Sequence, residues 1–176
     1  MKRYLSIFFT IMFFVIGSSH AGVVQSYDDM NECTIIAPSE DVRTHTMREK
    51  NGRGLDYQFG VKFIKFNSKS SPKVIIFFQV LQNTFGCYTN YIKIKTKSGK
   101  LYTVKVDDNY RTSLFGGRIK PYGSSATISA DDYKKYFLHD IPVKIQVSLE
   151  ETLQLYVGPR QIKGLTQMAN YFKETF

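Results

Sequence analysis

The amino-acid sequence predicts a single, mainly β domain, either a β-sandwich or a strongly bent antiparallel sheet, with two short helices in the C-terminal third. Three observations lead to this fold class. Short runs of β-branched and aromatic residues recur along the chain and are separated by turn residues. The run over 73–81 is the densest apolar run outside the N-terminus, and it is too short to favour a helix. Apolar residues at helical spacing follow Ser129.

The N-terminal residues 1–21 are expected to be a secretory signal peptide. Two basic residues precede an apolar stretch over 5–16, and a small-x-small cleavage site ends at Ala21. A retained membrane anchor is the alternative, but the stretch is shorter than the ~20 residues that span a bilayer core. We therefore expect 22–176 to be one exported β-rich domain, periplasmic or secreted, and not an integral membrane protein.

The net charge of +9, which becomes +7 once Lys2 and Arg3 are removed with the predicted signal peptide, indicates the kind of partner that an exported chain could bind. A basic surface attracts anionic lipid head groups, acidic glycans or an acidic protein face. Export makes nucleic acid a poor choice of partner. The alternative is that the charge only keeps the domain soluble.

The two cysteines, Cys33 and Cys87, predict one disulfide bond. Two cysteines in an exported chain most simply pair with each other. Such a bond would contribute roughly 4 kcal/mol through the entropy of the unfolded chain.

The first elements are a polar lead-in over 22–32, a short strand over 33–37 and a polar segment over 39–54. That segment is expected to be an exposed loop or a loosely held hairpin, and it serves either as a solvated connector or as a basic contact loop. The basic residues that would form the contact loop are Arg43, His45, Arg48, Lys50 and Arg53.

The middle of the chain predicts a strand over 55–63, because apolar and polar residues alternate there. Alternation is lost over 63–66, which indicates a bulge or the end of the strand. A turn over 67–72 leads into the run over 73–81. That run is apolar on both faces, so it is expected to be a central strand with both faces covered.

The clearest hairpin joins strands over 91–96 and 101–106 through a turn that contains Gly99. Alternation places basic, aromatic and hydroxyl side chains together on one face, a combination that suits an anionic or glycan partner. The alternative is that these lysines keep an open sheet face soluble and discourage edge pairing. The residues of this possible binding face are Tyr91, Lys93, Lys95, Thr103 and Lys105.

The last third begins after a predicted turn at 107–109 and an irregular segment over 110–123 with one bent strand around 118–120. Ser129 is a suitable N-cap for a short helix, and two acidic residues follow it. Strands are expected over 142–147 and 152–157. An amphipathic helix with apolar residues from Ile162 to Phe172 closes the domain.

The order of features from Lys100 to Phe172 resembles the C-terminal half of the invasion-associated locus B family of exported Gram-negative envelope proteins. The strongest local similarity is the phrase Ile-Lys-Gly-Leu-Thr-Gln-Met-Ala, which enters the final helix. The resemblance implies a β-sandwich-like envelope protein without catalytic residues that takes part in contact with host cells. It supplies no site residues.

The sequence contains no motif that dictates a reaction. It has no His-Glu-x-x-His zinc site, no Gly-x-Ser-x-Gly elbow and no Cys-x-x-Cys pair. Its adjacent carboxylates diverge on strands or turns, whereas acid and base groups must converge. We therefore expect a non-enzymatic binding protein without a cofactor, with a periplasmic inhibitor or immunity protein, or an unfamiliar glycan or cell-wall hydrolase, as alternatives.

Overall fold

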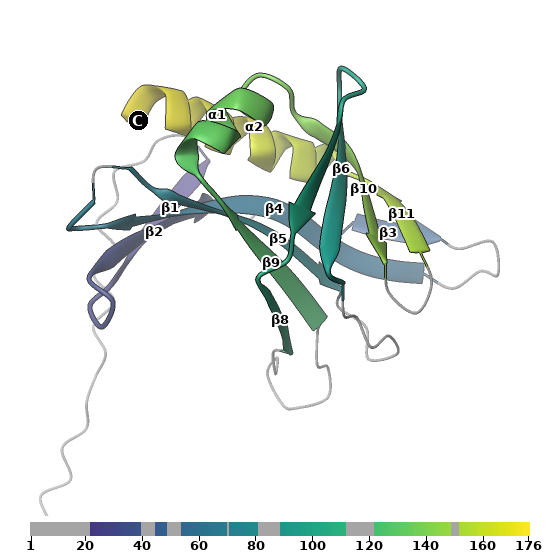
Figure 1. The fold of residues 1–176 in the computed structure, drawn as a ribbon, viewed down its shortest axis with the longest axis horizontal. Coiled ribbons are helices and arrows are strands. Elements are labelled where there is room, and N and C mark those ends of the chain that lie inside the picture. Colours follow the sequence, from purple (N-terminus) through teal and green to yellow (C-terminus); the bar gives the residue numbers. More distant parts are fainter. Residues whose placement is uncertain are drawn as a thin grey trace, which may run out of the picture.

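A computed structural model describes residues 22–39, 45–48, 54–69, 71–80, 89–111, 122–148 and 152–176. Within these ranges the chain forms two antiparallel sheets and two helices, the second at the C-terminus (Figure 1). The predicted mainly β fold class is therefore confirmed.

The larger sheet has the strand order β1-β2-β4-β5-β9-β8, and β3 pairs with β4 beside this path. The smaller sheet has the order β11-β10-β6-β7. The large-sheet strands are β1 (Val23–Asp28), β2 (Cys33–Pro38), β3 (His45–Arg48), β4 (Gly54–Phe66), β5 (Lys73–Val80), β8 (Asp108–Arg111) and β9 (Tyr122–Ile128). The small-sheet strands are β6 (Tyr91–Thr96), β7 (Leu101–Lys105), β10 (Pro142–Ser148) and β11 (Thr152–Tyr156).

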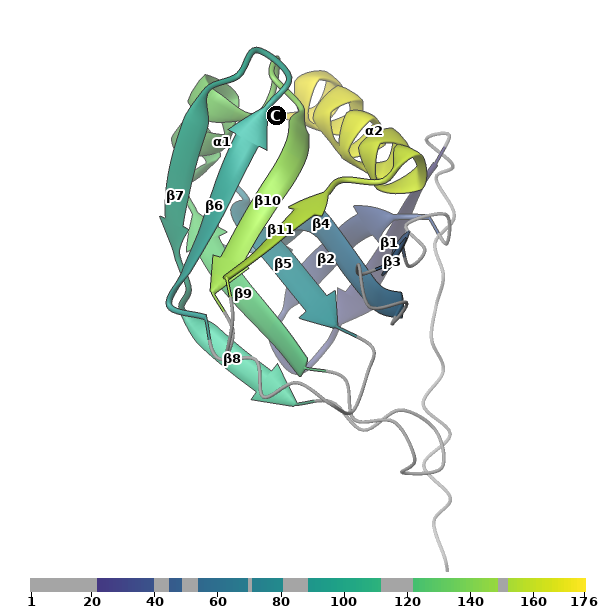
Figure 2. The same ribbon diagram turned by 90° about the vertical axis from the view of Figure 1, so that its right-hand side faces the viewer.

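The small sheet and both helices lie on the same side of the large sheet (Figures 1 and 2). Helix α2 (Pro159–Thr175) packs against β1, β2 and β4, and α1 (Ala130–Tyr136) packs against β5. One apolar core fills the space between these layers. The Phe63 ring of β4 is fully buried there, and its centroid lies 5.3 Å from the ring centroids of both Tyr133 and Phe172.

One stretch of chain belongs to both sheets. Strand β7 pairs with β6 in the small sheet, and β8 pairs with β9 in the large sheet, with only Val106 and Asp107 between them. The Val106 N–H donates to the Asn90 carbonyl at 2.9 Å, and the Asp107 N–H donates to the Ser125 carbonyl at 2.9 Å. The predicted turn at 107–109 is therefore wrong, because the backbone stays extended and changes its partner.

Several local predictions are confirmed. The hairpin of β6 and β7 turns at Gly99, whose φ of 89° suits glycine. The Ser129 hydroxyl accepts a hydrogen bond from the Asp132 N–H at 3.0 Å and caps α1. The strands over 33–37, 142–147 and 152–157 and the closing amphipathic helix are also present. The bent strand around 118–120 lies outside the described residues.

One prediction for the large sheet is wrong and one alternative is excluded, because sheet pairing outweighs local pattern. The expected lead-in over 22–32 contains β1, a largely polar strand whose backbone pairs with β2 over its full length. Of the two alternatives expected over 63–66, the bulge is absent, because the pairing of β4 with β2 runs without a register shift, and the strand ends at Phe66.

Strand β5 is central, as predicted, but it is buried on one face only. Its inner side chains are buried, whereas Ile75, Phe77 and Gln79 on the outward face are half-buried. The Phe77 ring lies over Gly60 on the neighbouring strand. A Cβ atom at position 60 would stand 2.7 Å from the tip of this ring, so the lack of a side chain at Gly60 leaves room for it.

Candidate binding face

The outward side of the small sheet is the strongest candidate for a binding surface. Strands β6 and β7 alternate between buried apolar and exposed polar or basic side chains. Tyr91, Lys93, Lys95, Thr103 and Lys105, the residues of the predicted face, are all exposed. Strands β10 and β11 widen this surface, which we call the lysine face: Tyr91, Lys93, Lys95, Leu101, Thr103, Lys105, Lys144, Gln146, Gln154 and Tyr156.

One row across the lysine face places two cations between two apolar side chains. Lys95 lies directly opposite Lys144 on β10 and opposite Leu101 on β7. Lys144 in turn lies opposite Tyr156 on β11, and its Nζ stands 5.0 Å from the centroid of that ring. Leu101 is 73% exposed and Tyr156 is 63% exposed. From the β7 edge to the β11 edge, the row therefore consists of an apolar side chain, two cations and an aromatic side chain.

The next row is polar and carries one further cation. Lys93 lies opposite Gln146 on β10 and Thr103 on β7, and Gln146 lies opposite Gln154 on β11. No hydrogen bond from another described residue engages either glutamine amide. Both amides therefore remain available to a ligand.

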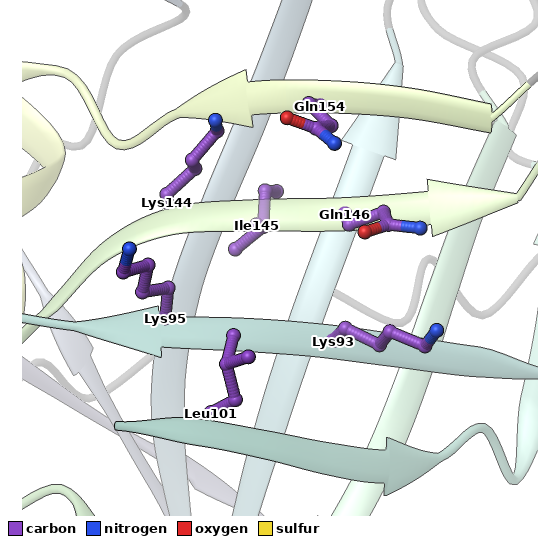
Figure 3. A pocket seen from close by; sticks show the side chains of 7 residues that line it. All are labelled: Lys93, Lys95, Leu101, Lys144, Ile145, Gln146 and Gln154. Atoms are coloured by element: carbon purple, nitrogen blue, oxygen red, sulfur yellow. The ribbon is translucent and has the colours of Figure 1, made fainter. Parts of the chain in front are cut away.

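The two rows enclose a shallow hollow of about 240 Å³. Figure 3 shows Lys95 and Lys144 at the same end of this hollow, with the Lys144 side chain turned toward the strand of Gln154, while Lys93 and Gln146 extend toward the other end. The lining residues are Lys93, Lys95, Leu101, Lys144, Ile145, Gln146 and Gln154. The hollow thus has a doubly cationic end and an amide-rich end.

The charge on the lysine face is unbalanced. Its described side chains include four lysines and no carboxylate, and no described residue forms an ion pair with any of the four. Like charges directly opposite each other in a sheet lower its stability, so the Lys95 and Lys144 pair carries an unfavourable term. An anion bound between the two ammonium groups would remove that term and gain attraction from both.

The end of the lysine face is held by Asp140. Its carboxylate accepts hydrogen bonds from the Thr96 hydroxyl at 2.7 Å and the Ser98 N–H at 2.9 Å, and a further one from the Ser98 hydroxyl. The bonds from Ser98 and Thr96 lower the pKa of Asp140. This carboxylate is therefore engaged in fixing the turn between β6 and β7.

The other edge of the lysine face is held from the core. The Tyr57 hydroxyl donates to the Tyr156 carbonyl on β11, and burial raises the pKa of Tyr57 to about 12. The buried Gln161 amide donates to the Tyr57 carbonyl at 3.2 Å, which connects this strand edge to the start of α2. The β11 edge of the face is thus attached to the layer beneath it.

The predicted contact loop is described only in part. His45 and Arg48 lie in β3, where their backbones pair with Tyr57 and Gly54 of β4, which agrees with the hairpin alternative for 39–54. Arg43, Lys50 and Arg53 lie outside the described residues. The contact loop therefore stays a prediction.

The predicted disulfide also stays a prediction, since Cys87 lies outside the described residues. Cys33 is buried, with 3% of its surface exposed, and has no disulfide partner within the described ranges. It pairs with Phe66 at one end of β4.

The described residues contain neither a cluster of metal ligands nor a helix that could span a membrane. No group of three or more His, Cys, Asp or Glu side chains among them could hold a metal ion. Neither helix in the described ranges is long and apolar enough to cross a bilayer.

Four of the ten residues of the lysine face could not be predicted from the hairpin alone. Lys144, Gln146, Gln154 and Tyr156 belong to strands that come much later in the chain. The signal that could have found them is their alternation with buried Ile145, Val147 and Leu155, which gives β10 and β11 a polar face too.

No family model, curated protein or solved structure matches this chain.

Proposed function

We propose that this chain is a non-enzymatic, exported binding protein of a bacterial envelope, and that its lysine face holds an anionic partner. The observation that carries the proposal is the placement of Lys95 directly opposite Lys144, with Lys93 beside them and no carboxylate among the described side chains of that face. Anion binding turns this unfavourable arrangement into a favourable one.

Export and a role in host contact rest on the sequence alone. The predicted signal peptide over 1–21 supports delivery to the periplasm or the medium. The resemblance to the invasion-associated locus B family supports a virulence or host-contact factor as the biological setting.

The test compares two variants of residues 22–176 that lose the same charge. The first replaces Lys93, Lys95 and Lys144 with Gln, and the control replaces the exposed Lys69, Lys135 and Lys173 with Gln. The probe is an immobilised sulfated polysaccharide, and the measured quantity is the dissociation constant at low and high salt.

We expect the first variant to bind roughly 3- to 100-fold more weakly, because three charge pairs near the surface contribute roughly 0.2–1 kcal/mol each. The control should stay within about twofold, and high salt should weaken the wild type. Equal losses in both variants would show that only net charge matters and would overturn the lysine face. Absence of binding by the wild type would also overturn it.

A further inference from the structure

We propose, as a refinement that rests on the proposed function, that the hollow of the lysine face binds one acidic sugar unit of an anionic glycan. The size of the hollow, the hydrogen-bonding groups that line it and the apolar side chains near it support this ligand class for the same site.

The size of the hollow suits one ring. Its volume of about 240 Å³ lies below the range of about 300–1,000 Å³ found for pockets that enclose a drug-sized ligand. A single sugar ring can occupy it while the neighbouring units of a glycan extend over the open sheet. Lys105 and Tyr91, opposite each other beyond the hollow, lie where a second unit would pass.

The lining groups demand both hydrogen-bond acceptors and donors from the ligand. The ammonium groups of Lys95 and Lys144 can only donate hydrogen bonds and carry a positive charge, so they favour an anionic acceptor. The amides of Gln146 and Gln154 each donate and accept, and their carbonyl oxygens need donors. A fully ionised phosphate or a carboxylate supplies acceptors only. A uronic acid unit supplies a carboxylate for the lysines and hydroxyl donors for the amides.

The apolar rim fits the faces of a sugar ring. Leu101 and Tyr156 stand at the two ends of the cationic row, and both are mostly exposed. A sugar ring has C–H groups on its faces, which can pack against apolar and aromatic side chains while its hydroxyls bond to polar groups. The rim and the lining together therefore fit a ligand that is anionic, hydroxylated and apolar on its faces.

The experiment measures binding of residues 22–176 to four probes by calorimetry and NMR titration. The probes are an oligogalacturonate, a neutral maltooligosaccharide of the same length, an oligoglutamate of the same charge, and vesicles that contain anionic phospholipid. Two variants accompany the wild type: Gln154→Leu, at an exposed position, and Gln146→Leu, at a half-buried one. Circular dichroism confirms that each variant is folded.

We expect the oligogalacturonate to bind at least tenfold more tightly than the oligoglutamate and the neutral sugar. Each glutamine variant should reduce that preference, and binding of the oligoglutamate should not change. Equal affinity for both anionic oligomers, with no effect of Gln154→Leu, would overturn the sugar assignment but leave the proposed function standing. Binding to vesicles without binding to the soluble sugar would have the same meaning. No binding to any anionic probe would overturn both.

Discussion

The outward faces of the two sheets differ in what their side chains contact. On the small sheet, Lys93 and Lys95 are exposed, and their charged ends have no described partner. On the large sheet, Ile35, Ile64 and Phe77 are half-buried and pack across neighbouring strands. Side chains of the second kind contribute to stability, whereas those of the first kind can be replaced at little cost to folding. The small sheet therefore offers a face that is free to serve binding.

The largest effect on the free energy of unfolding is expected for a residue of the buried core, Phe63. Phe63→Ala should lower the free energy of unfolding by about 3–5 kcal/mol, because the ring is fully buried against Tyr133 and Phe172. Urea denaturation measures this change. The control, Leu101→Ala on the lysine face, should change it by less than about 0.5 kcal/mol. A small effect of Phe63→Ala would show that this ring is not packed tightly between the large sheet and the two helices.

The two outward faces are compared directly by Phe77→Ala and Lys93→Ala. Phe77→Ala should destabilise the fold by about 1–2 kcal/mol, because it removes a half-buried ring that covers Gly60. Lys93→Ala should stay within about 0.5 kcal/mol, because Lys93 is exposed. Thermal unfolding of both variants gives the difference. Equal effects would remove the distinction between the faces.

The contact between Phe77 and Gly60 can be isolated with a double-mutant cycle. Gly60→Ala alone should destabilise the fold slightly, because its Cβ would meet the ring of Phe77. In the Phe77→Ala background the same change should stabilise the strand by roughly 0.5–1 kcal/mol, because alanine restricts the unfolded chain more than glycine does. A coupling energy of about 1 kcal/mol is expected from chemical denaturation. A coupling near zero would mean that the ring does not cover the glycine.

The smallest expected effect has the opposite sign. Lys95→Gln should raise the free energy of unfolding by a few tenths of a kcal/mol at low salt, because it removes the like-charge contact with Lys144. The gain should disappear at high salt, since exposed charges are then screened. Lys105→Gln, opposite the uncharged Tyr91, serves as the matched control. Destabilisation by Lys95→Gln would indicate that the lysine contributes packing.

The alternation of apolar and polar residues predicted the strands that have one solvent-exposed and one buried face. Residues 55–63 and 91–96 alternate clearly, because core and solvent impose opposite demands on successive side chains. Strand β9 was missed, since its Gly123, Ser124 and Ala126 are small residues without strong strand preference. It is a strand because β5 and β8 flank it and satisfy its backbone.

The sequence predicted the part of the lysine face that lies on the β6 and β7 hairpin. Tyr91, Lys93 and Lys95 share a face with Thr103 and Lys105 because a short turn fixes their register. The contribution of Lys144 depends on β10 pairing with β6, which joins distant parts of the chain. Local alternation can orient Lys144 outward, but it cannot choose the neighbouring strand.

The continuous passage from β7 to β8 also bears on how fast the lysine face can bind a ligand. Because neighbouring residues are hydrogen-bonded into different sheets at Val106 and Asp107, the small sheet cannot swing away without breaking bonds in the large one. A ligand therefore meets a backbone already in its binding conformation, and the ordering entropy lost on association is that of the side chains. Without a slow opening step, the association rate constant is governed by electrostatic attraction, and it should fall steeply as ionic strength increases.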